Sequence, residues 1–302
     1  MDIAVLGADR AAQEIARACL LAGETVRLHA TDATAVMDGI DIIERDIDDA
    51  YDTGYVDADR RDMAVKRLEG TTGLDAAVTD VDIVIDATTQ DVSALQTRFA
   101  KLEELLDDAV VSSAVSAISV TNAAAGLRQP KQAVGFRFHR FPEPFVEVVM
   151  AEQTGSEAAS LAWQLAERVS SDCVSVRDTP GNLSLRLTLA LEVAAIRMLD
   201  EGVAGVEAID TAFKHTYRSE VGPLERADSV GLDERYDTLR SLSERLGSRF
   251  EPPPMLTALV EEGQTGKEAG EGFYIWEDDT PTRSALADPT IPDEQYRPDS
   301  AE

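Results

Sequence analysis

The segment Gly135 to Val149, "GFRFHRFPEPFVEVV", concentrates the side chains best suited to proton transfer. It places one histidine, His139, among two arginines and two glutamates, in a stretch whose pattern predicts a strand leaving a buried sheet. Imidazole gains or loses a proton near neutral pH, so His139 is a candidate general base. The alternative is an ordinary polar residue at the end of a strand, paired with a surface acid.

A second candidate site is the loop Gly7-Ala8-Asp9-Arg10-Ala11-Ala12, which ends the apolar run "DIAVLG". In a dinucleotide-binding strand-turn-helix, the glycines of G-x-G-x-x-G allow the tight turn, the approach to the pyrophosphate and the packing of the helix. Gly7 is present and Ala12 is an accepted substitute at the third position, but Asp9 replaces the second glycine. A carboxylate about 4 Å from a phosphate is opposed by about 1 to 4 kcal/mol, which salt and Arg10 would offset in part.

The residues after two later strands decide which cofactor this loop would bind. An acid near the end of the second strand binds the ribose of NAD, but "ETVRLHA" ends in His29 and Ala30, and Asp32 comes two residues later. NAD, NADP and no nucleotide therefore remain open. Ala87 and Gln90, at the end of the third strand and after it, complete the candidate cofactor-binding set.

The elements that would position these residues alternate between strands and helices. Apolar runs predict strands over residues 2–7, 24–30, 80–88 and 109–115, and the segments between them are long enough for helices. Such alternation predicts a mostly parallel sheet covered on both faces. Residues 132–139 would add a further strand.

The pattern changes after "DTPGN" (178–182), where a long helix begins a second domain. Its apolar residues form two faces, one of Leu183, Leu187, Ala190, Leu191, Ala194 and Met198 and the other of Leu185, Leu189, Val193 and Ile196. A helix that is apolar on two faces is buried or lies in a subunit interface. We expect a first domain over 1–181, a helical domain over 182–280 and a disordered acidic tail over 281–302.

The composition is strongly acidic, with 57 acidic against 28 basic residues and a formal net charge of −29. This charge repels nucleic acids and anionic membranes. Only five of the basic residues are lysines and the acids are spread along the chain, which is typical of a salt-rich cytoplasm. No signal peptide or long apolar run occurs, so we expect a cytoplasmic protein. Cys19 and Cys173 lack zinc-site spacing and are expected to be buried thiols, with no metal site.

Several later segments resemble the L-3-hydroxyacyl-CoA dehydrogenase family in order and spacing, over residues 1 to 276. They are "VVSSAVSAISVT", "FPEPFVEVV", "DTPGNLSLRL", "IDTAFKHTYRSEVGPLERADSVGLD" and "GKEAGEGFYIW". The resemblance implies a Rossmann-like NAD domain followed by an all-α dimerisation domain, that is, an α/β fold with a helical second part. It also implies an acyl-CoA substrate, oxidised as a 3-hydroxyacyl thioester at the cleft between the domains, and a homodimer through the helix from Leu183.

The family's chemistry uses a histidine base and a glutamate that orients it, and Glu147 matches that glutamate. The family pattern for the histidine reads G-x-H-F-F-N-P-x-P. Anchoring it on Gly135 puts Arg137 in the histidine position, and a guanidinium stays protonated and cannot be a base. Anchoring it on the two prolines of "FPEP" puts His139 there. Residues 137 and 139 of a strand point the same way, about 7 Å apart, so both alignments remain open.

Other positions match the family or depart from it. Ser113 matches a serine that contacts the substrate hydroxyl, and Ser116 follows in register. Gln90 replaces a glutamate near the nicotinamide, Ala114 replaces an amide beside the cofactor, and Leu185 replaces an asparagine that hydrogen-bonds the substrate and the histidine.

Three functions follow from these matches and departures. The first is an NAD(P)-dependent 3-hydroxyacyl-CoA dehydrogenase with a remodelled site, in which His139 is the base, Glu147 its partner and Ser113 the substrate contact. The second is a non-catalytic homologue that binds acyl-CoA or nucleotide, or pairs with an active relative. The third is an oxidoreductase of the same fold that acts on a small hydroxy acid.

Overall fold

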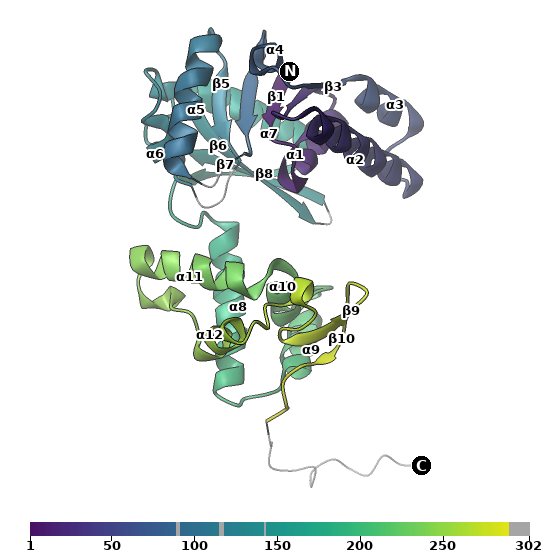
Figure 1. The fold of residues 1–302 in the computed structure, drawn as a ribbon, viewed down its shortest axis with the longest axis vertical. Coiled ribbons are helices and arrows are strands. Elements are labelled where there is room, and N and C mark those ends of the chain that lie inside the picture. The colour runs from purple at the N-terminus through teal and green to yellow at the C-terminus, as the bar shows by residue number, and fades with distance from the viewer. Residues whose placement is uncertain (89–90, 115–117, 142, 290–302) are drawn as a thin grey trace. The chain divides into compact units, whose positions relative to one another are not determined.

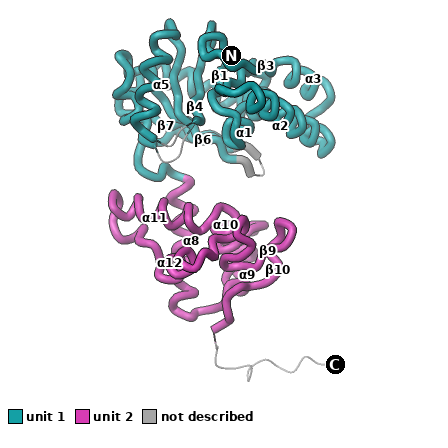
Figure 2. The backbone as a smooth tube through the Cα atoms, in the orientation of Figure 1, with its two compact units in different colours: residues 1–183 teal, residues 184–302 magenta. Residues whose placement is uncertain are grey.

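A computed structural model describes residues 1–88, 91–114, 118–141 and 143–289. The chain divides into two compact units, Met1–Leu183 and Ser184–Glu302 (Figure 2). This division lies two residues beyond the predicted boundary of 181. Asn182 and Leu183 belong to the first unit because both hydrogen-bond to its last strands, as described below.

Unit 1 is built on one sheet, in which the described strands run in the order β3-β2-β1-β4-β5-β6-β7-β8 (Figure 1). They are β1 (Asp2–Leu6), β2 (Thr25–His29), β3 (Leu68–Thr71), β4 (Ile83–Asp86), β5 (Val110–Ser113), β6 (Ala133–Phe141), β7 (Glu143–Met150) and β8 (Asp172–Arg177). All neighbours pair in parallel except β6 with β7. The predicted α/β fold is confirmed. The sequence does not predict β3, because "LEGT" has one strongly apolar residue.

Helices cover both faces of this sheet, and alternation along the strands decides which side chains each face receives. One face packs against α1 (Arg10–Leu21), α2 (Ala33–Asp52) and α7 (Ser156–Val169), and α3 (Ala58–Lys66) joins the same core. The other face packs against α4 (Leu74–Val78), α5 (Val92–Leu105) and α6 (Val120–Ala124). Ile3 and Val5 of β1 point into the first layer, whereas Ala4 and Leu6 point into the second.

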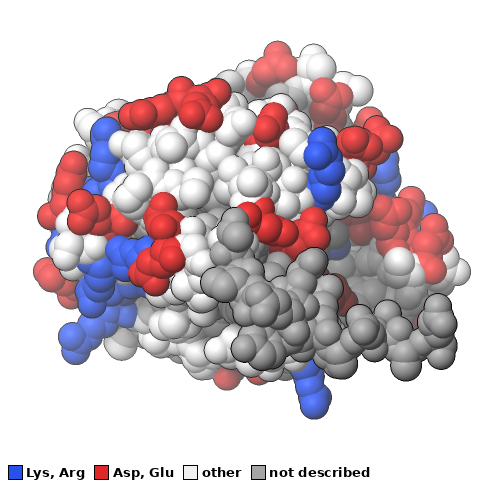
Figure 3. Space-filling view, turned by 90° about the horizontal axis from the view of Figure 1, so that it is seen from below, with Lys and Arg blue, Asp and Glu red and all other residues white. Residues whose placement is uncertain are grey.

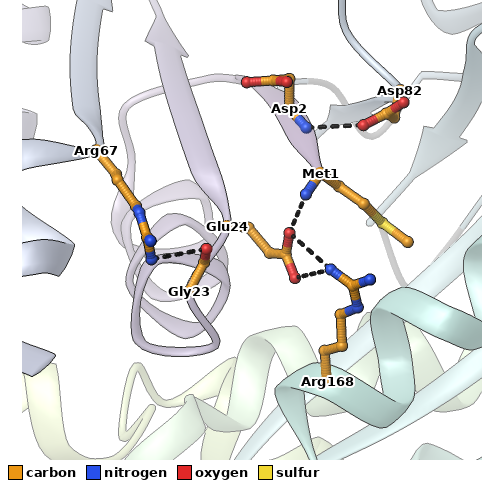
Figure 4. A network of polar contacts seen from close by, with 7 residues as sticks. All are labelled: Met1, Asp2, Gly23, Glu24, Arg67, Asp82 and Arg168. Carbon is orange, nitrogen blue, oxygen red and sulfur yellow. Dashed lines mark hydrogen bonds and ion pairs between the residues drawn. The ribbon is translucent and has the colours of Figure 1, made fainter.

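A polar network ties α7 to the edge of the sheet where β2 begins (Figure 4). Glu24, only 1% exposed, accepts hydrogen bonds at 3.0 and 3.4 Å from Arg168 of α7, and the nitrogen of Met1 lies against the same carboxylate. The Arg67 side chain donates to the Gly23 carbonyl at 2.8 Å. Glu24 thus fixes the helix that connects β7 to β8.

Unit 2 is a helical core with one small hairpin. It contains α8 (Ser184–Asp200), α9 (Val206–Tyr217), α10 (Pro223–Val230), α11 (Leu232–Leu246), α12 (Pro254–Glu261), β9 (Tyr274–Glu277) and β10 (Thr280–Ser284). Of the two predicted faces of α8, the one with Leu189, Val193 and Ile196 is buried. The other remains exposed, with Leu187 at 61% and Leu191 at 42% exposed.

The prediction that the tail begins at residue 281 is wrong for 281–284. These residues form β10, which pairs antiparallel with β9. The strand is held by backbone pairing at the surface, so its side chains lack the apolar alternation by which sequence patterns reveal strands. Residues 290–302 lie outside the described part of the chain.

One buried carboxylate, Asp210, organises the start of α10 in unit 2 and explains the glycine that precedes this helix. Asp210 accepts hydrogen bonds from the amides of Leu224 and Glu225 at 2.9 Å and from the Tyr274 hydroxyl at 3.0 Å. A Cβ on Gly222 would lie 2.2 Å from the Asp210 carboxyl carbon. Only glycine lets this carboxylate reach the first turn of α10, so the "GP" sequence has a structural role here.

The sequence also led to expectations about the cysteines, membrane-spanning helices and surface charge. Cys19 is buried in the core of unit 1, and Cys173 is half-buried. In the ranges that the structure describes, no helix has both the length and the apolarity to cross a membrane. On the face that Figure 3 presents, carboxylates lie in several separate groups with basic residues between them.

Candidate active site

The candidate site is built on the antiparallel pair β6 and β7. Arg137 lies directly opposite Glu147, and His139 lies opposite Phe145. Side chains alternate along a strand, so residues 137, 139 and 147 share one face of the sheet. The neighbouring residue Phe136 points the other way, into the core under α1 and α7.

The structure brings His139 and Glu147 together. The Nε2 atom of His139 lies 3.1 Å from Oε1 of Glu147, whose side chain is 0% exposed. The second carboxylate oxygen of Glu147 accepts from the Leu183 amide at 3.2 Å. A carboxylate is an acceptor, so Nε2 carries the proton in this contact and Nδ1 is the nitrogen left with a lone pair. That is the arrangement of an oriented general base.

The His139 ring is also accessible. Its side chain is 37% exposed, and its centroid lies 5.6 Å from that of Phe145. His139 and Phe138 also line a cavity of about 290 Å³, together with residues of α1 and α2 such as Ala18 and Ala50. His139 therefore combines a buried partner, Glu147, with a side chain that is partly exposed.

Arg137 is held in a different way. Its Nη1 donates to the Ala114 carbonyl at 2.6 Å. With the Asn182 amide oriented so that its oxygen faces the guanidinium, this oxygen accepts from Nε at 2.7 Å and from Nη2 at 2.9 Å. Burial lowers the pKa of Arg137 to about 10, against the opposing effect of the Glu147 and Asp178 charges. Arg137 is thus a cation at neutral pH and cannot accept a proton.

Each of the two alignments left open by the sequence describes part of this geometry. Gly135 pairs with Ser113 at the end of β5, and Arg137 reaches back to the next residue, Ala114. Arg137 therefore lies at the place that the Gly135 alignment gives it. His139, two residues further along, contacts the Glu147 carboxylate through Nε2 at 3.1 Å. Ser113 is 1% exposed and lies four strand positions before His139, so the two are not adjacent in register.

Three residues of the predicted cofactor site meet at the loop before α1. Gly7 has φ of +119°, a conformation that favours glycine, and its amide donates to the His29 carbonyl at 2.8 Å. A Cβ on Gly7 would lie 3.3 Å from the Cβ of Ala12 and 3.6 Å from the backbone of Ala87. Ala12 itself is fully buried. The turn and the close helix packing that a dinucleotide requires are both present.

Asp9 is the one residue of this loop that does not fit an anionic ligand. Its carboxylate accepts from the Ala12 amide at 3.0 Å and caps α1, so it occupies the amino end of the helix. Arg10 does not neutralise it, because its side chain bonds to Glu14 at 3.2 Å and to Asp46 at 2.8 Å. The loop fits a dinucleotide in shape and opposes it in charge.

Among the described residues that follow β2, the acid expected to bind the adenosine ribose is replaced by Ala30, as the sequence indicates. Ala30 follows β2 and is half-buried, and the Asp32 carboxylate caps α2 by accepting from the Ala35 amide at 3.0 Å. Asp86, at the end of β4, is fully buried and lies 3.0 Å from Arg98. Gln90 and Ser116 lie outside the described residues.

Sequence reasoning missed the two residues that fix the site from the end of unit 1. The side-chain amide of Asn182 binds Arg137, and the backbone amide of Leu183 donates to Glu147. The available signal is the dipeptide Gly181-Asn182, because both residues have positive φ, 77° and 45°, and asparagine tolerates that conformation best among non-glycine residues. This signal indicates a turn but not the residue that the amide contacts.

The sheet order, the glycine turn before α1 and the separate helical unit together define a dinucleotide-binding α/β protein with a helical second unit. Residues 2–179 match the model of the 3-hydroxyacyl-CoA dehydrogenase NAD binding domain, and residues 181–276 match the model of the C-terminal domain of the same enzyme. The chain belongs to the 3-hydroxyacyl-CoA dehydrogenase family. The expectation of NAD(H) as the cofactor is confirmed by the match to an NAD binding domain.

Individual relatives agree with this assignment. A 3-hydroxybutyryl-CoA dehydrogenase of Mycobacterium tuberculosis is 31% identical over 284 residues, which cover 91% of this chain and 98% of the relative. One from Bradyrhizobium diazoefficiens is 30% identical over 277 residues, covering 90% and 94%. The crystal structure of M. tuberculosis FadB2 superposes with a TM-score of 0.84 at 31% identity, covering 91% of this chain and 98% of that one.

Proposed function

We propose that the protein is an NAD(H)-dependent oxidoreductase that interconverts a 3-hydroxyacyl-CoA and the corresponding 3-oxoacyl-CoA, with His139 as the general base. The observation that carries this proposal is the 3.1 Å contact between His139 Nε2 and the buried Glu147 carboxylate. The names of the relatives favour a short acyl chain, since both are 3-hydroxybutyryl-CoA dehydrogenases.

The chain's own groups would move one proton. In oxidation, Nδ1 of His139 accepts the proton of the substrate hydroxyl, and the positive ring is stabilised by the Glu147 carboxylate on Nε2. In reduction, the same nitrogen returns the proton to the substrate oxygen. NAD(H), when bound, supplies the acceptor or donor of the hydride. A role for Ser113 as a substrate contact stays a prediction, because its hydroxyl is buried in this structure.

A kinetic comparison of two histidine variants tests the role of His139. His139→Gln should lower kcat for acetoacetyl-CoA reduction by NADH about 10² to 10⁴-fold, with the melting temperature unchanged. His215→Gln is the matched control, because His215 is an exposed imidazole on α9 of unit 2. Equal rates for wild type and His139→Gln would show that His139 is not the general base.

A non-catalytic homologue is the second candidate, and Arg137 favours it. A buried guanidinium lies where the Gly135 alignment expects the base, and three of its N–H groups are bound to Ala114 and Asn182. Such a protein would bind acetoacetyl-CoA or NADH without turnover. Calorimetric binding of both ligands combined with no NADH oxidation by wild type would favour this candidate over the enzyme.

We also propose that α8 forms a homodimer interface. Leu187 and Leu191 of α8 and Leu183, which directly precedes the helix, recur at four-residue spacing, and all are more than 40% exposed. Ala190 and Ala194 extend the same exposed face. An apolar helix face of this size is unfavourable in water and favours association with a second copy.

We propose that the protein works at high salt concentration, because its composition is strongly acidic. Carboxylates that repel one another at low ionic strength are screened within about 3 Å at 1 M salt.

A further inference from the structure

We propose that Asp9 is an internal competitor of the cofactor, whose carboxylate occupies the amino end of α1 and makes NAD(H) binding weak at low salt and tighter at high salt. This inference rests on the proposed use of NAD(H) by the chain. The shape of the loop is common to the family. The competition between a carboxylate and the cofactor arises from Asp9, the residue that this chain has at the second glycine position.

The position of the Asp9 side chain carries the first step. Asp9 has φ of −73° and ψ of 177°, an ordinary extended conformation, so no backbone strain turns the side chain away from the helix. Its Oδ1 accepts from the Ala12 amide at 3.0 Å. The amino end of a helix attracts anions because its first amides lack helical partners and the helix dipole is positive there. Asp9 satisfies one of these amides and places a full negative charge on the dipole.

The second step is that the neighbouring cation does not compensate the charge of Asp9. Arg10, the basic residue next to Asp9, has its guanidinium on the carboxylates of Glu14 and Asp46. Asp9 therefore faces an incoming pyrophosphate with its charge unbalanced by its neighbour. Gln13 does not help, because its amide nitrogen donates to the Ala8 carbonyl at 2.8 Å.

The consequence is an unusual dependence on salt. Repulsion between two charges about 4 Å apart near a protein surface weakens association by about tenfold or more, and this repulsion is screened by salt. The net charge of −29 repels NADH at long range in every variant alike. Only the difference between variants at position 9 isolates the local effect.

NADH titrations of three variants test this inference. Fluorescence of NADH is followed at 0.05, 0.5 and 2 M KCl with wild type, Asp9→Asn and Asp57→Asn. Asparagine keeps an N-cap and removes the charge. Asp57 caps α3 by the same contact, accepting from the Arg60 amide at 2.8 Å, so Asp57→Asn removes one charge from an equivalent cap elsewhere. Melting temperatures recorded without NADH report the stability of each cap separately from binding.

At 0.05 M KCl, Asp9→Asn should bind NADH about tenfold or more tightly than wild type, and this gap should close at 2 M KCl. Asp57→Asn should match wild type at every salt concentration. Measurable but equal affinities for wild type and Asp9→Asn would overturn the inference and leave NAD(H) use intact. Weaker binding by Asp9→Asn would also overturn it, because the carboxylate would then contribute to binding. No NADH binding by any variant at any salt concentration would overturn the proposed function together with the inference.

Discussion

Replacement of Asn182 by glycine would test how firmly the turn at the end of unit 1 holds the site. Glycine removes the amide oxygen and tolerates positive φ, so the backbone turn is preserved. Arg137 would lose two hydrogen bonds, at 2.7 and 2.9 Å, each worth about 1.5 to 3 kcal/mol for a charged donor. Glycine has no backbone strain at positive φ, so the substitution also stabilises the folded state by about 1 kcal/mol relative to asparagine. The net decrease in the free energy of unfolding of unit 1 should be about 2 to 5 kcal/mol.

The two tryptophans allow this decrease to be measured in unit 1 alone. Trp163 lies on α7 of unit 1, and Trp276 lies on β9 of unit 2. In a Trp276→Phe background, urea unfolding followed by tryptophan emission reports on unit 1. Asn182→Asp is the matched control, because it keeps an acceptor oxygen for Arg137 and loses only the donation of the amide to the Thr179 carbonyl at 3.3 Å, so its decrease should be smaller than that of Asn182→Gly.

Two results would refute this reasoning. A decrease below about 0.5 kcal/mol for Asn182→Gly would mean that the contacts at Asn182 contribute no more than an ordinary surface residue. A decrease for Asn182→Asp equal to that for Asn182→Gly would show that the acceptor oxygen is not the source of the effect.

The remaining predictions concern unit 2. Leu187→Glu should convert the proposed dimer to a monomer, as measured by light scattering. Val203→Glu, at a similarly exposed apolar position outside α8, should leave the mass unchanged. A dimeric Leu187→Glu variant would exclude α8 as the interface. Burial raises the pKa of Glu192 to about 7, against the opposing charges of Arg235 and Arg226, so the folded state holds a proton there that the unfolded state releases at lower pH. The free energy of unfolding of wild type relative to Glu192→Gln should therefore be greatest below about pH 4.5 and fall by about 1 to 3 kcal/mol as the pH rises to 7. Urea unfolding at each pH measures this difference. A difference that does not depend on pH would contradict the prediction.

The parts of the fold that depend on local pattern could be predicted from the sequence. β1, the turn at Gly7 and the two faces of α8 follow from apolar spacing and from the conformational freedom of glycine. β3 and β10 could not be predicted, because their side chains are mostly polar and the backbone pairing that holds them depends on distant strands.

The candidate site was only partly accessible to sequence reasoning. The sequence identifies His139, Arg137 and Glu147 as the charged residues of one hairpin, but which of them meet depends on strand register and on side-chain orientation. The contact between Asn182 and Arg137 joins positions 45 residues apart, and no local pattern indicates it. The cap formed by Asp9 could have been predicted, because aspartate is among the residues preferred before the first turn of a helix.

The pairing of β6 with β7 limits how a proton-accepting group can be relocated in such a protein. Phe136 and Phe138 belong to the core layer, while Gly135, Arg137 and His139 alternate with them. Moving an imidazole by one position would bury it among the phenylalanines, so two positions is the shortest move that conserves access to the carboxylate of Glu147. A general base in an engineered enzyme can therefore be moved along a strand of this kind only by an even number of residues, because an odd number would turn its side chain to the opposite face of the sheet.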